Sequence, residues 1–352
     1  MKIAIVAGGT GGHVYPALTL AEELEKRGND ITFIGSTSRM EKDVVPEHGF
    51  KYIGLDVEIF AHGIKGKLVS GKTIIQEYRH CLRLLKDFDM AIGFGNYISV
   101  PVMLAAKKLG LKTVIHEQNS FVGKANRFLD KKMDLVIGSY AEDKSQFKNP
   151  NTLILGNPQA SKAVDVKKDD KVLKDFGLDP KKKTVVIFMG SLGSQTVNEV
   201  IMEYFRLTDG SYQIVYASGK QNWEIVSKSV DKKSYLVLRE TIDGVKVMKN
   251  SDLLVCRAGA TTLAEITAMG MPAILIPSPY VPNNHQFFNA KSLVDKDAAL
   301  MIEEKDLSAE SLKKMIDEVI NDDKRLKTLA DNARALGNPN VLEDIVEAIE
   351  KL

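Results

Sequence analysis

Two glycine-rich segments of the sequence carry residues that could hold a phosphate group. Residues 8–13 read Gly-Gly-Thr-Gly-Gly-His and stand between a short apolar run and a helical pattern. Residues 189–194 read Met-Gly-Ser-Leu-Gly-Ser and follow a second apolar run in the same way. Glycines let backbone N–H groups approach an anion closely, and a helix start adds unpaired N–H groups. Both segments are therefore candidate phosphate sites.

The first glycine segment lacks the residues that complete two common nucleotide sites. A dinucleotide site has an acidic residue about 20 positions further on, at the end of the second strand, to hold a ribose. Here that strand, predicted at residues 30–35, is followed by Ser36 and Thr37. A P-loop ends in Gly-Lys-Ser or Gly-Lys-Thr, which is absent from this loop. NAD and ATP are therefore disfavoured, and binding of a diphosphate remains open.

The segment from Cys256 to Glu265 is the richest in residues that could bind a nucleotide. Its sequence, CRAGATTLAE, leaves an apolar run, turns at Gly259 and begins a helix with threonines available as caps. Such a helix start attracts phosphate through its N–H groups and its dipole. Glu265 lies about one turn further in, where its carboxylate could accept hydrogen bonds from both hydroxyls of a ribose. An ordinary place on the helix surface is the alternative for Glu265.

The order of apolar and helical segments predicts two domains built on parallel sheets. Residues 2–7, 17–26 and 30–35 read as strand, helix and strand, which is the βαβ unit of a parallel sheet. From Lys183 the same layout begins again, with an apolar strand, a glycine-rich turn and a helix. This duplication predicts an α/β protein of two doubly wound, Rossmann-like domains facing a cleft. Further strands are expected at residues 90–93, 112–116, 135–138, 213–217, 235–238, 253–256 and 273–277.

The composition fits a globular protein with a core in each of two domains. The chain has 352 residues, 44% of them hydrophobic, and a net charge of +2, which gives no argument for nucleic acid. Cys81 and Cys256 match no metal or redox spacing and are expected to be packing residues. No apolar run approaches the roughly 20 residues that span a bilayer, and the first apolar run is too short for a signal peptide. The sequence therefore predicts a cytoplasmic protein whose contact with a membrane is at most peripheral.

A basic, amphipathic segment covers residues 64–86. Glu77 is its one acidic residue, and its cations are Lys65, Lys67, Lys72, Arg79, Arg83 and Lys86. A segment of this kind can lie on an anionic bilayer. The alternative is a helix whose cations face solvent while its apolar side packs on its own domain.

Several short motifs occur in one order along nearly the whole chain. They are Gly8–His13, His116-Glu117-Gln118-Asn119, Gly156-Asn157-Pro158, residues 190–198, residues 257–265, His285-Gln286 and Asn289-Ala290. Together they closely resemble the MurG family of N-acetylglucosaminyltransferases. The resemblance implies the GT-B fold, UDP-N-acetylglucosamine as donor, undecaprenyl-pyrophosphoryl-N-acetylmuramyl-pentapeptide (lipid I) as acceptor and lipid II as product. It also implies a role in peptidoglycan synthesis and cell wall biogenesis, and so in cell shape and division.

The resemblance implies that residues 158–337 form the domain that binds the UDP-sugar. Glu265 would bind the ribose hydroxyls, and the backbone at Ile242 would contact the edge of the uracil. Gln286, with His285 beside it, would hold hydroxyls of the N-acetylglucosamine. The residues expected at or near the diphosphate are Gly190, Ser191, Gly193, Arg257, Gly259, Ala260 and Thr261.

Residues 1–157 with 338–352 would form the acceptor-binding, membrane-facing domain. The expected reaction is an inverting displacement in which the acceptor's C4 hydroxyl attacks C1 of the sugar, and it needs a general base. His13 is the first candidate because imidazole titrates near neutral pH, with hydrogen bonding to phosphate as its alternative role. Glu117 is the second candidate, or it orients His13 or the sugar. Residues expected to contact the acceptor are Gly9, Thr10, Gly11, Gly12, Asn96, Tyr97, Gln118 and Asn119.

The sequence departs from the family pattern at two places in the expected donor site. Where relatives often carry Gly-Gly-Ser-Gln, this chain has Met189-Gly190-Ser191-Leu192, so only backbone and Ser191 contacts carry over. After Gly156-Asn157-Pro158 many relatives have a nearby arginine, and here Gln159-Ala160 follows. Lys220 is a candidate to supply the missing positive charge.

The resemblance also implies the partners and the location of the protein. The partners would be UDP-N-acetylglucosamine, lipid I, an anionic membrane surface on its cytoplasmic side and other proteins of cell-wall synthesis, with no nucleic acid, cofactor or metal. Two other functions stay open. A UDP-N-acetylglucosamine 2-epimerase of the same fold would convert the sugar nucleotide without a lipid, and a non-catalytic nucleotide-sugar-binding protein would turn nothing over.

Overall fold

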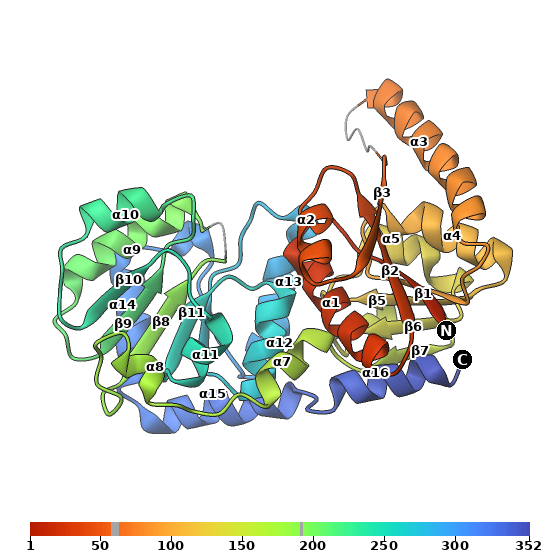
Figure 1. Ribbon diagram of the computed structural model, residues 1–352. Coiled ribbons are helices and arrows are strands. Elements are labelled where there is room, and N and C mark those ends of the chain that lie inside the picture. Colours follow the sequence, from red (N-terminus) through yellow and green to blue (C-terminus); the bar gives the residue numbers. More distant parts are fainter. Residues whose placement is uncertain (58–62, 191–192) are drawn as a thin grey trace. The chain divides into compact units, whose positions relative to one another are not determined.

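The computed structural model describes residues 1–57, 63–190 and 193–352, and the side chains of residues 63–70 lie outside this description. The chain divides into two compact units, Met1–Gln159 with Asn340–Leu352, and Ala160–Pro339. Each boundary lies two residues beyond the one expected from the sequence. In Figure 1 the first unit carries the red to yellow part of the chain together with the last blue helix.

The first unit is built on a 7-stranded parallel sheet in the order β3-β2-β1-β4-β5-β6-β7. Ile3 of β1 pairs with Ile31 of β2 on one side and with Met90 of β4 on the other. The strand order therefore reverses beside β1, and the loops after β1 and β4 are neighbours at this switch point. The strands are β1 (Lys2–Val6), β2 (Asp30–Ser36), β3 (Lys51–Leu55), β4 (Met90–Gly93), β5 (Lys112–Glu117), β6 (Leu135–Gly138) and β7 (Thr152–Ile154).

Helices cover both faces of this sheet because each parallel strand needs a crossover to the next (Figure 1). The last helix of the chain, α16 (Val341–Glu350), returns to this unit and packs beside α1, where Arg27 forms ion pairs with Glu343 and Glu350. The other helices are α1 (Gly11–Lys26), α2 (Glu41–Glu47), α3 (Gly63–Leu84), α4 (Ser99–Leu109), α5 (Lys124–Leu129), η1 (Asp130–Lys132) and α6 (Asp143–Gln146), and η2 (Pro158–Ala160) leads out of the unit.

The second unit repeats the design on a 6-stranded parallel sheet in the order β10-β9-β8-β11-β12-β13. Its switch point lies between β8 and β11, so the loops that follow these two strands are neighbours. The strands are β8 (Thr184–Phe188), β9 (Gln213–Ala217), β10 (Leu236–Arg239), β11 (Leu253–Cys256), β12 (Ala273–Leu275) and β13 (Leu300–Met301).

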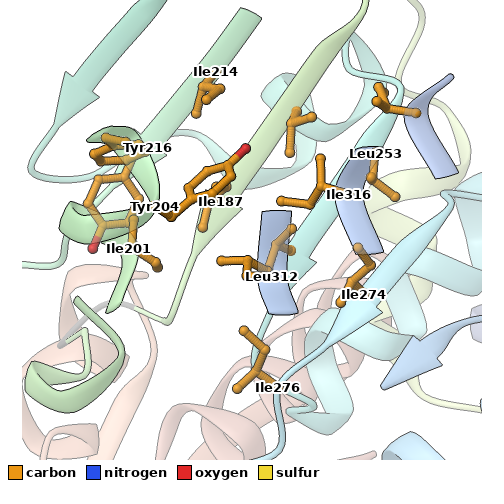
Figure 2. Close-up of a cluster of buried hydrophobic side chains, with 14 of the residues drawn as sticks. Ile187, Ile201, Tyr204, Ile214, Tyr216, Leu253, Ile274, Ile276, Leu312 and Ile316 are labelled. Atoms are coloured by element: carbon orange, nitrogen blue, oxygen red, sulfur yellow. The ribbon is translucent and has the colours of Figure 1, made fainter. Parts of the chain in front are cut away.

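The core of the second unit lies between its sheet and helices α9 and α14. Ile187 and Leu253 from the strands meet Tyr204 of α9 and Leu312 and Ile316 of α14 in one buried cluster (Figure 2). The remaining elements are α7 (Ser161–Val164), α8 (Lys171–Lys174), α9 (Gln195–Leu207), α10 (Trp223–Ser229), α11 (Gly244–Lys249), α12 (Ala260–Met269), η3 (Pro282–Asn284), α13 (His285–Val294), η4 (Glu304–Asp306), α14 (Ala309–Ile320) and α15 (Asp323–Leu336). The predicted pair of doubly wound α/β domains is confirmed.

Helix α3 contains most of the basic, amphipathic segment. Its C-terminal half packs on α4, where Cys81 is buried in the core and Ile74, Tyr78 and Leu82 pack against it. Toward its N-terminus the helix extends away from the rest of its unit in Figure 1. Ile75 is 53% exposed. Of the helices that the structure describes, none combines the length and the apolar character that crossing a bilayer requires.

Candidate functional site

The glycine loop after β1 enters helix α1 with its backbone held on two sides. The carbonyl of Gly8 accepts a hydrogen bond from Asn96 Nδ2 at 2.7 Å, and the N–H of Gly9 donates to Glu41 Oε2 at 3.1 Å. Helix α1 then begins at Gly11, so the first N–H groups of the helix have no acceptor within it. The loop thus offers the backbone donors of a helix start at the switch point of the sheet.

His13 lies in the first turn of α1 and is oriented by its neighbour Thr10. Its Nδ1 lies 3.0 Å from Thr10 Oγ1, and a Cβ added at Gly95, in the loop after β4, would lie 3.6 Å from its ring. A bond from Nδ1–H to the threonine oxygen would leave Nε2 as the basic nitrogen of a neutral imidazole. The structure therefore brings His13 together with the β1 and β4 loops, as an acid or base at this place would need.

Glu117 ends β5 and is enclosed by hydrogen-bond donors. Its side chain is 3% exposed, and its two oxygens accept five bonds of 3.0 to 3.2 Å. The donors are the backbone N–H groups of Gln118, Asn119 and Gly123 and the side-chain amides of Asn119 and Asn126. A carboxylate used in this way organises a loop, and taking up a substrate proton would disrupt that network.

His116, in the same strand, holds the chain near the end of the first unit. Its Nε2 lies 2.9 Å from the carbonyl of Gly156, so Nε2 carries the proton, and Nδ1 accepts from Gln118 Nε2 at 3.1 Å. Burial lowers the pKa of His116 to about 4, against a smaller upward effect of the bond to Gly156. Gln118 is buried with it, so of the motif at residues 116–119 only Asn119 is partly exposed.

The lowered pKa of His116 predicts a loss of stability in acid. Its folded pKa of about 4 lies below the ordinary 6.5, so the unfolded chain binds the extra proton between these pH values. The contribution of neutral His116 to the free energy of unfolding is complete above pH 6.5. At pH 5 about 2 kcal/mol of this contribution is lost. Urea unfolding of the wild type and of His116→Gln at pH 7 and pH 5 measures this difference. Burial raises the pKa of Asp143 to about 8, which changes stability with pH in the opposite direction, but this effect is the same in both proteins and cancels in the comparison. Equal pH dependence of the free energy of unfolding in both proteins would contradict the lowered pKa of His116.

Arg257 stands where β11 turns toward α12 and connects three parts of the second unit. Its side chain donates to the carbonyl of Ile276 at 3.1 Å and to Ser194 Oγ at 2.8 Å, and it lies 2.7 Å from Glu304 Oε2. Both charged groups of this ion pair are nearly buried. Thr196 Oγ1 donates to the other oxygen of Glu304 at 2.6 Å. Arg257 therefore positions the loop after β8 beside the start of α12.

The two loops at the switch point of the second unit are rich in groups suited to an anion. Gly259 precedes the first residue of α12, and Thr261 Oγ1 is buried with no hydrogen-bond partner among the residues that the structure describes. In the neighbouring loop Gly193 has a φ of +78°, and a Cβ there would lie 2.1 Å from the carbonyl oxygen of Ser218. Only glycine fits this position. Ser191 falls outside the described residues, between Gly190 and Gly193.

The remaining residues of the expected donor site lie on several loops and helices of the second unit. Glu265 is half-buried in α12, with Ala260 one turn before it. Gln286 accepts from the backbone N–H of Ser278 at 2.8 Å, and His285 Nδ1 donates to the carbonyl of Pro282 at 2.9 Å. Ile242 lies in the loop between β10 and α11, and Lys220 is an exposed residue after β9. Gln159, which stands where an arginine was expected, is bonded instead to Thr19 of α1 in the first unit.

Several residues that shape these loops were missed by the sequence reasoning. Glu41, Asn126 and Glu304 are polar residues at or near the ends of short helices, which is where such residues are common for local reasons. The partners of Glu41 and Glu304 lie far along the chain, and Gly9 is 32 positions from Glu41. The partners of Asn126 lie 9 and 10 positions away, beyond the next turn of a helix. No local signal separates them from ordinary helix-end residues.

Two domain models of one enzyme family match the chain. The glycosyltransferase family 28 N-terminal domain matches residues 3–137, and the glycosyltransferase family 28 C-terminal domain matches residues 184–346. The first match lies within the first structural unit, and the second covers most of the second unit and continues into α16, which belongs to the first. The order of the two domains along the chain is the one that the GT-B resemblance implies.

Curated proteins named UDP-N-acetylglucosamine–N-acetylmuramyl-(pentapeptide) pyrophosphoryl-undecaprenol N-acetylglucosamine transferase are similar over the full length. The protein from Pediococcus pentosaceus is 36% identical and the one from Bacillus licheniformis 37%, each covering 100% of this chain and 99% of the relative. The crystal structure of Acinetobacter baumannii MurG has a TM-score of 0.82 at 25% identity over 100% of this chain and 99% of that one. A putative UDP-N-acetylglucosamine 2-epimerase from Listeria monocytogenes has a TM-score of 0.69 at 16% identity, covering 99% and 95%, and shares the fold. The family expected from the motifs is confirmed.

Proposed function

The chain belongs to the family of UDP-N-acetylglucosamine–N-acetylmuramyl-(pentapeptide) pyrophosphoryl-undecaprenol N-acetylglucosamine transferases, and from this we propose its reaction. It transfers N-acetylglucosamine from UDP-N-acetylglucosamine to the C4 hydroxyl of lipid I and so makes lipid II for peptidoglycan. The observation that carries the proposal is the 36% identity over 100% of this chain, which includes both units. The likeness to an epimerase rests on the fold at 16% identity and does not favour that activity.

The second unit binds the donor in this proposal. The diphosphate lies at the start of α12, between Gly259 and the glycine loop after β8, where backbone N–H groups and the helix dipole meet it. Glu265 accepts from the ribose hydroxyls, and Ile242 lies at the uracil. Gln286 and His285 contact the sugar. Arg257 supports the site by its buried ion pair with Glu304.

The first unit binds the acceptor and supplies the base. The acceptor diphosphate lies at the start of α1, near Gly11 and Gly12, and Asn96, Tyr97 and Asn119 line the same region. His13 Nε2 takes the proton of the C4 hydroxyl as that oxygen bonds to C1 of the sugar. The bond from C1 to the UDP oxygen breaks with inversion, and donor-site N–H groups stabilise the charge on the departing diphosphate.

Glu117 has a positioning role in this account because its oxygens already accept five hydrogen bonds. It holds the loop that presents Asn119, and His13 remains the base. Gln118 supports the same loop from within the core through its bond to His116.

Identification of the product tests the proposed reaction. Incubation with UDP-N-acetylglucosamine and a short-chain lipid I should give a product heavier by one N-acetylhexosamine, with the new linkage in the β configuration. Mass spectrometry and the anomeric proton coupling in NMR read these two properties. Appearance of an epimerised sugar nucleotide instead, or of an α linkage, would count against the proposal.

Docking to the cytoplasmic face of an anionic membrane is proposed for the N-terminal part of α3. Lys72 is exposed there and Ile75 is exposed near the middle of the helix, whereas the apolar side of the C-terminal half packs on α4. Changing Lys65, Lys67 and Lys72 to Glu should lower binding to anionic vesicles at least about tenfold, because each basic residue near such a surface contributes about 1 kcal/mol.

The control for this charge reversal changes three lysines of the second unit to Glu, namely Lys181, Lys182 and Lys296. These lysines are exposed and give the same change in net charge. Vesicle sedimentation at two salt concentrations compares the variants. Equal loss of binding in both variants would assign the effect to net charge and reject docking through α3.

A further inference from the structure

One peptide group of the first glycine loop is held by two side chains from different parts of the first unit, one in α2 and one in the loop after β4. It joins Gly8 to Gly9, and its carbonyl accepts from Asn96 Nδ2 at 2.7 Å while its N–H donates to Glu41 Oε2 at 3.1 Å. In a trans peptide these two groups point in opposite directions. The two bonds therefore fix the plane of the peptide from both sides.

Glu41 is fully buried and hydrogen-bonded at the place where it makes this contact. It is the first residue of α2, its side chain is 0% exposed, and its other oxygen accepts from the N–H and the hydroxyl of Ser36 at 3.0 and 2.7 Å. A buried carboxylate needs such donors to offset its lost hydration. Gly35 makes room for it, because a Cβ there would lie 2.7 Å from Glu41 Cγ. The carboxylate thus ties the end of β2 to the loop after β1.

Asn96 holds the peptide from the loop after β4. Its φ is +66°, a value that asparagine adopts more readily than most residues other than glycine. Gly9 has a φ of +91°, and a Cβ at this position would lie 2.2 Å from Asn96 Nδ2. The close approach of the asparagine and the backbone conformation both require glycine at position 9.

The orientation of this peptide decides which groups the loop offers to a ligand. Two consecutive glycines allow their shared peptide to rotate at little steric cost. Rotation would turn the Gly9 N–H toward Asn96 and the Gly8 carbonyl toward the carboxylate of Glu41, so both bonds would be lost and the entry into α1 would no longer be held. In the orientation held by Glu41 and Asn96, the donors left for an anion are those of the helix start at Gly11 and Gly12.

We propose that Glu41 and Asn96 are positioning residues that lock the Gly8–Gly9 peptide and thereby set the acceptor diphosphate site. This inference rests on the proposed function, because it assigns the glycine loop to the acceptor. Glu41 acts through the loop and does not touch the substrate. Loss of either bond releases the peptide and lowers kcat/KM for the acceptor, while binding of UDP by the other unit is unaffected.

Steady-state kinetics of Glu41→Gln, Asn96→Gly and the double variant test this clamp. Each single change should lower kcat/KM for a short-chain lipid I about tenfold or more. Glu41→Gln removes the charged acceptor of the Gly9 N–H, and Asn96→Gly removes the donor to the Gly8 carbonyl. The dissociation constant of UDP should stay within about twofold. Because both residues hold one peptide, the loss in the double variant should be well below the product of the two single losses.

Asp134→Asn is the matched control for removing a well-bonded carboxylate. Asp134 accepts from the N–H and the hydroxyl of Thr113 at 2.9 and 2.7 Å, as Glu41 does with Ser36, but at the amino end of β5. Its loss should lower the unfolding temperature without changing kcat/KM for the acceptor. Asn96→Gly keeps a residue that tolerates positive φ, so it remains informative even where Glu41→Gln folds poorly.

The outcomes separate this inference from the proposed function. A wild type without lipid-dependent release of UDP would overturn the function on which it rests. An active wild type with unchanged acceptor kcat/KM in both single variants would overturn the clamp alone. The clamp would also be overturned if the loss of kcat/KM in the double variant equalled the product of the two single losses, because the two residues would then contribute independently.

Discussion

Replacing His13 with alanine should lower kcat for lipid I-dependent release of UDP by about two to four orders of magnitude, the usual contribution of a general base. The C4 hydroxyl would then have to lose its proton to water. The donor KM should change little, because His13 lies in the first unit, in the turn that follows Thr10. Initial rates at saturating concentrations of both substrates measure this effect.

The alternative role for His13 is hydrogen bonding to the acceptor diphosphate, and His13→Asn distinguishes the two. Asparagine keeps a donor but has no basic nitrogen. If His13 is the base, His13→Asn is as slow as His13→Ala, and the acidic limb of the wild-type pH–rate profile is absent from both. Recovery of kcat to within about tenfold of the wild type would assign His13 to phosphate binding.

Replacing Glu265 with alanine should raise the dissociation constant of UDP about a hundredfold or more. The carboxylate is proposed to accept from both ribose hydroxyls, and each hydrogen bond to a charged group contributes about 1.5 to 3 kcal/mol. Glu265 lies in α12 of the second unit, so the KM for the acceptor should stay near that of the wild type. Isothermal titration of UDP measures the first value and steady-state kinetics the second.

Deoxy-UDP, which lacks one ribose hydroxyl, makes the test of Glu265 specific. The wild type should bind it more weakly than UDP by about tenfold or more, and Glu265→Ala should bind the two nucleotides almost equally. Glu310→Ala removes an exposed carboxylate from α14 of the same unit and serves as the control. The same preference for UDP in Glu265→Ala as in the wild type would place the ribose elsewhere.

The central strands and the edge strand β10 were predictable from the sequence, and the other three edge strands were not. β1 and β8 are buried on both faces of their sheets and therefore read as continuous apolar runs. β3, β7 and β13 lie at the edges and are only partly buried. β3 and β7 mix polar with apolar residues, and β13 has only two residues. Their place depends on pairing with a neighbour, as Thr32 pairs with Lys51, and local sequence does not contain that information.

The loops that form the candidate site were predictable from the sequence, but the roles of the individual residues in them were not. The glycines at positions 9 and 259 marked the two switch points because such turns follow buried strands. The burial of Glu117 among five donors was not predictable, because three of those donors come from the backbone of the loop itself. The contact of Glu41 with Gly9 depends on how α2 packs on β2 and β3, which no local pattern fixes.

The basic, amphipathic segment at residues 64–86 was predictable as a helix, but its packing partner was not. Its spacing predicted an amphipathic helix, and α3 covers Gly63–Leu84. The partner of the apolar side could not be derived from periodicity. The structure places Ile74, Tyr78 and Leu82 against the core of the first unit and leaves Ile75 exposed. The C-terminal half thus fits the packing alternative, and membrane docking remains a proposal for the N-terminal part.

The most direct measurement is release of UDP from UDP-N-acetylglucosamine by the wild-type protein, with and without a short-chain lipid I. The proposed function predicts release that depends on the acceptor and matches, mole for mole, the N-acetylglucosamine that becomes attached to lipid. Conversion of the sugar nucleotide without acceptor, or binding of UDP with no turnover in either condition, would contradict it.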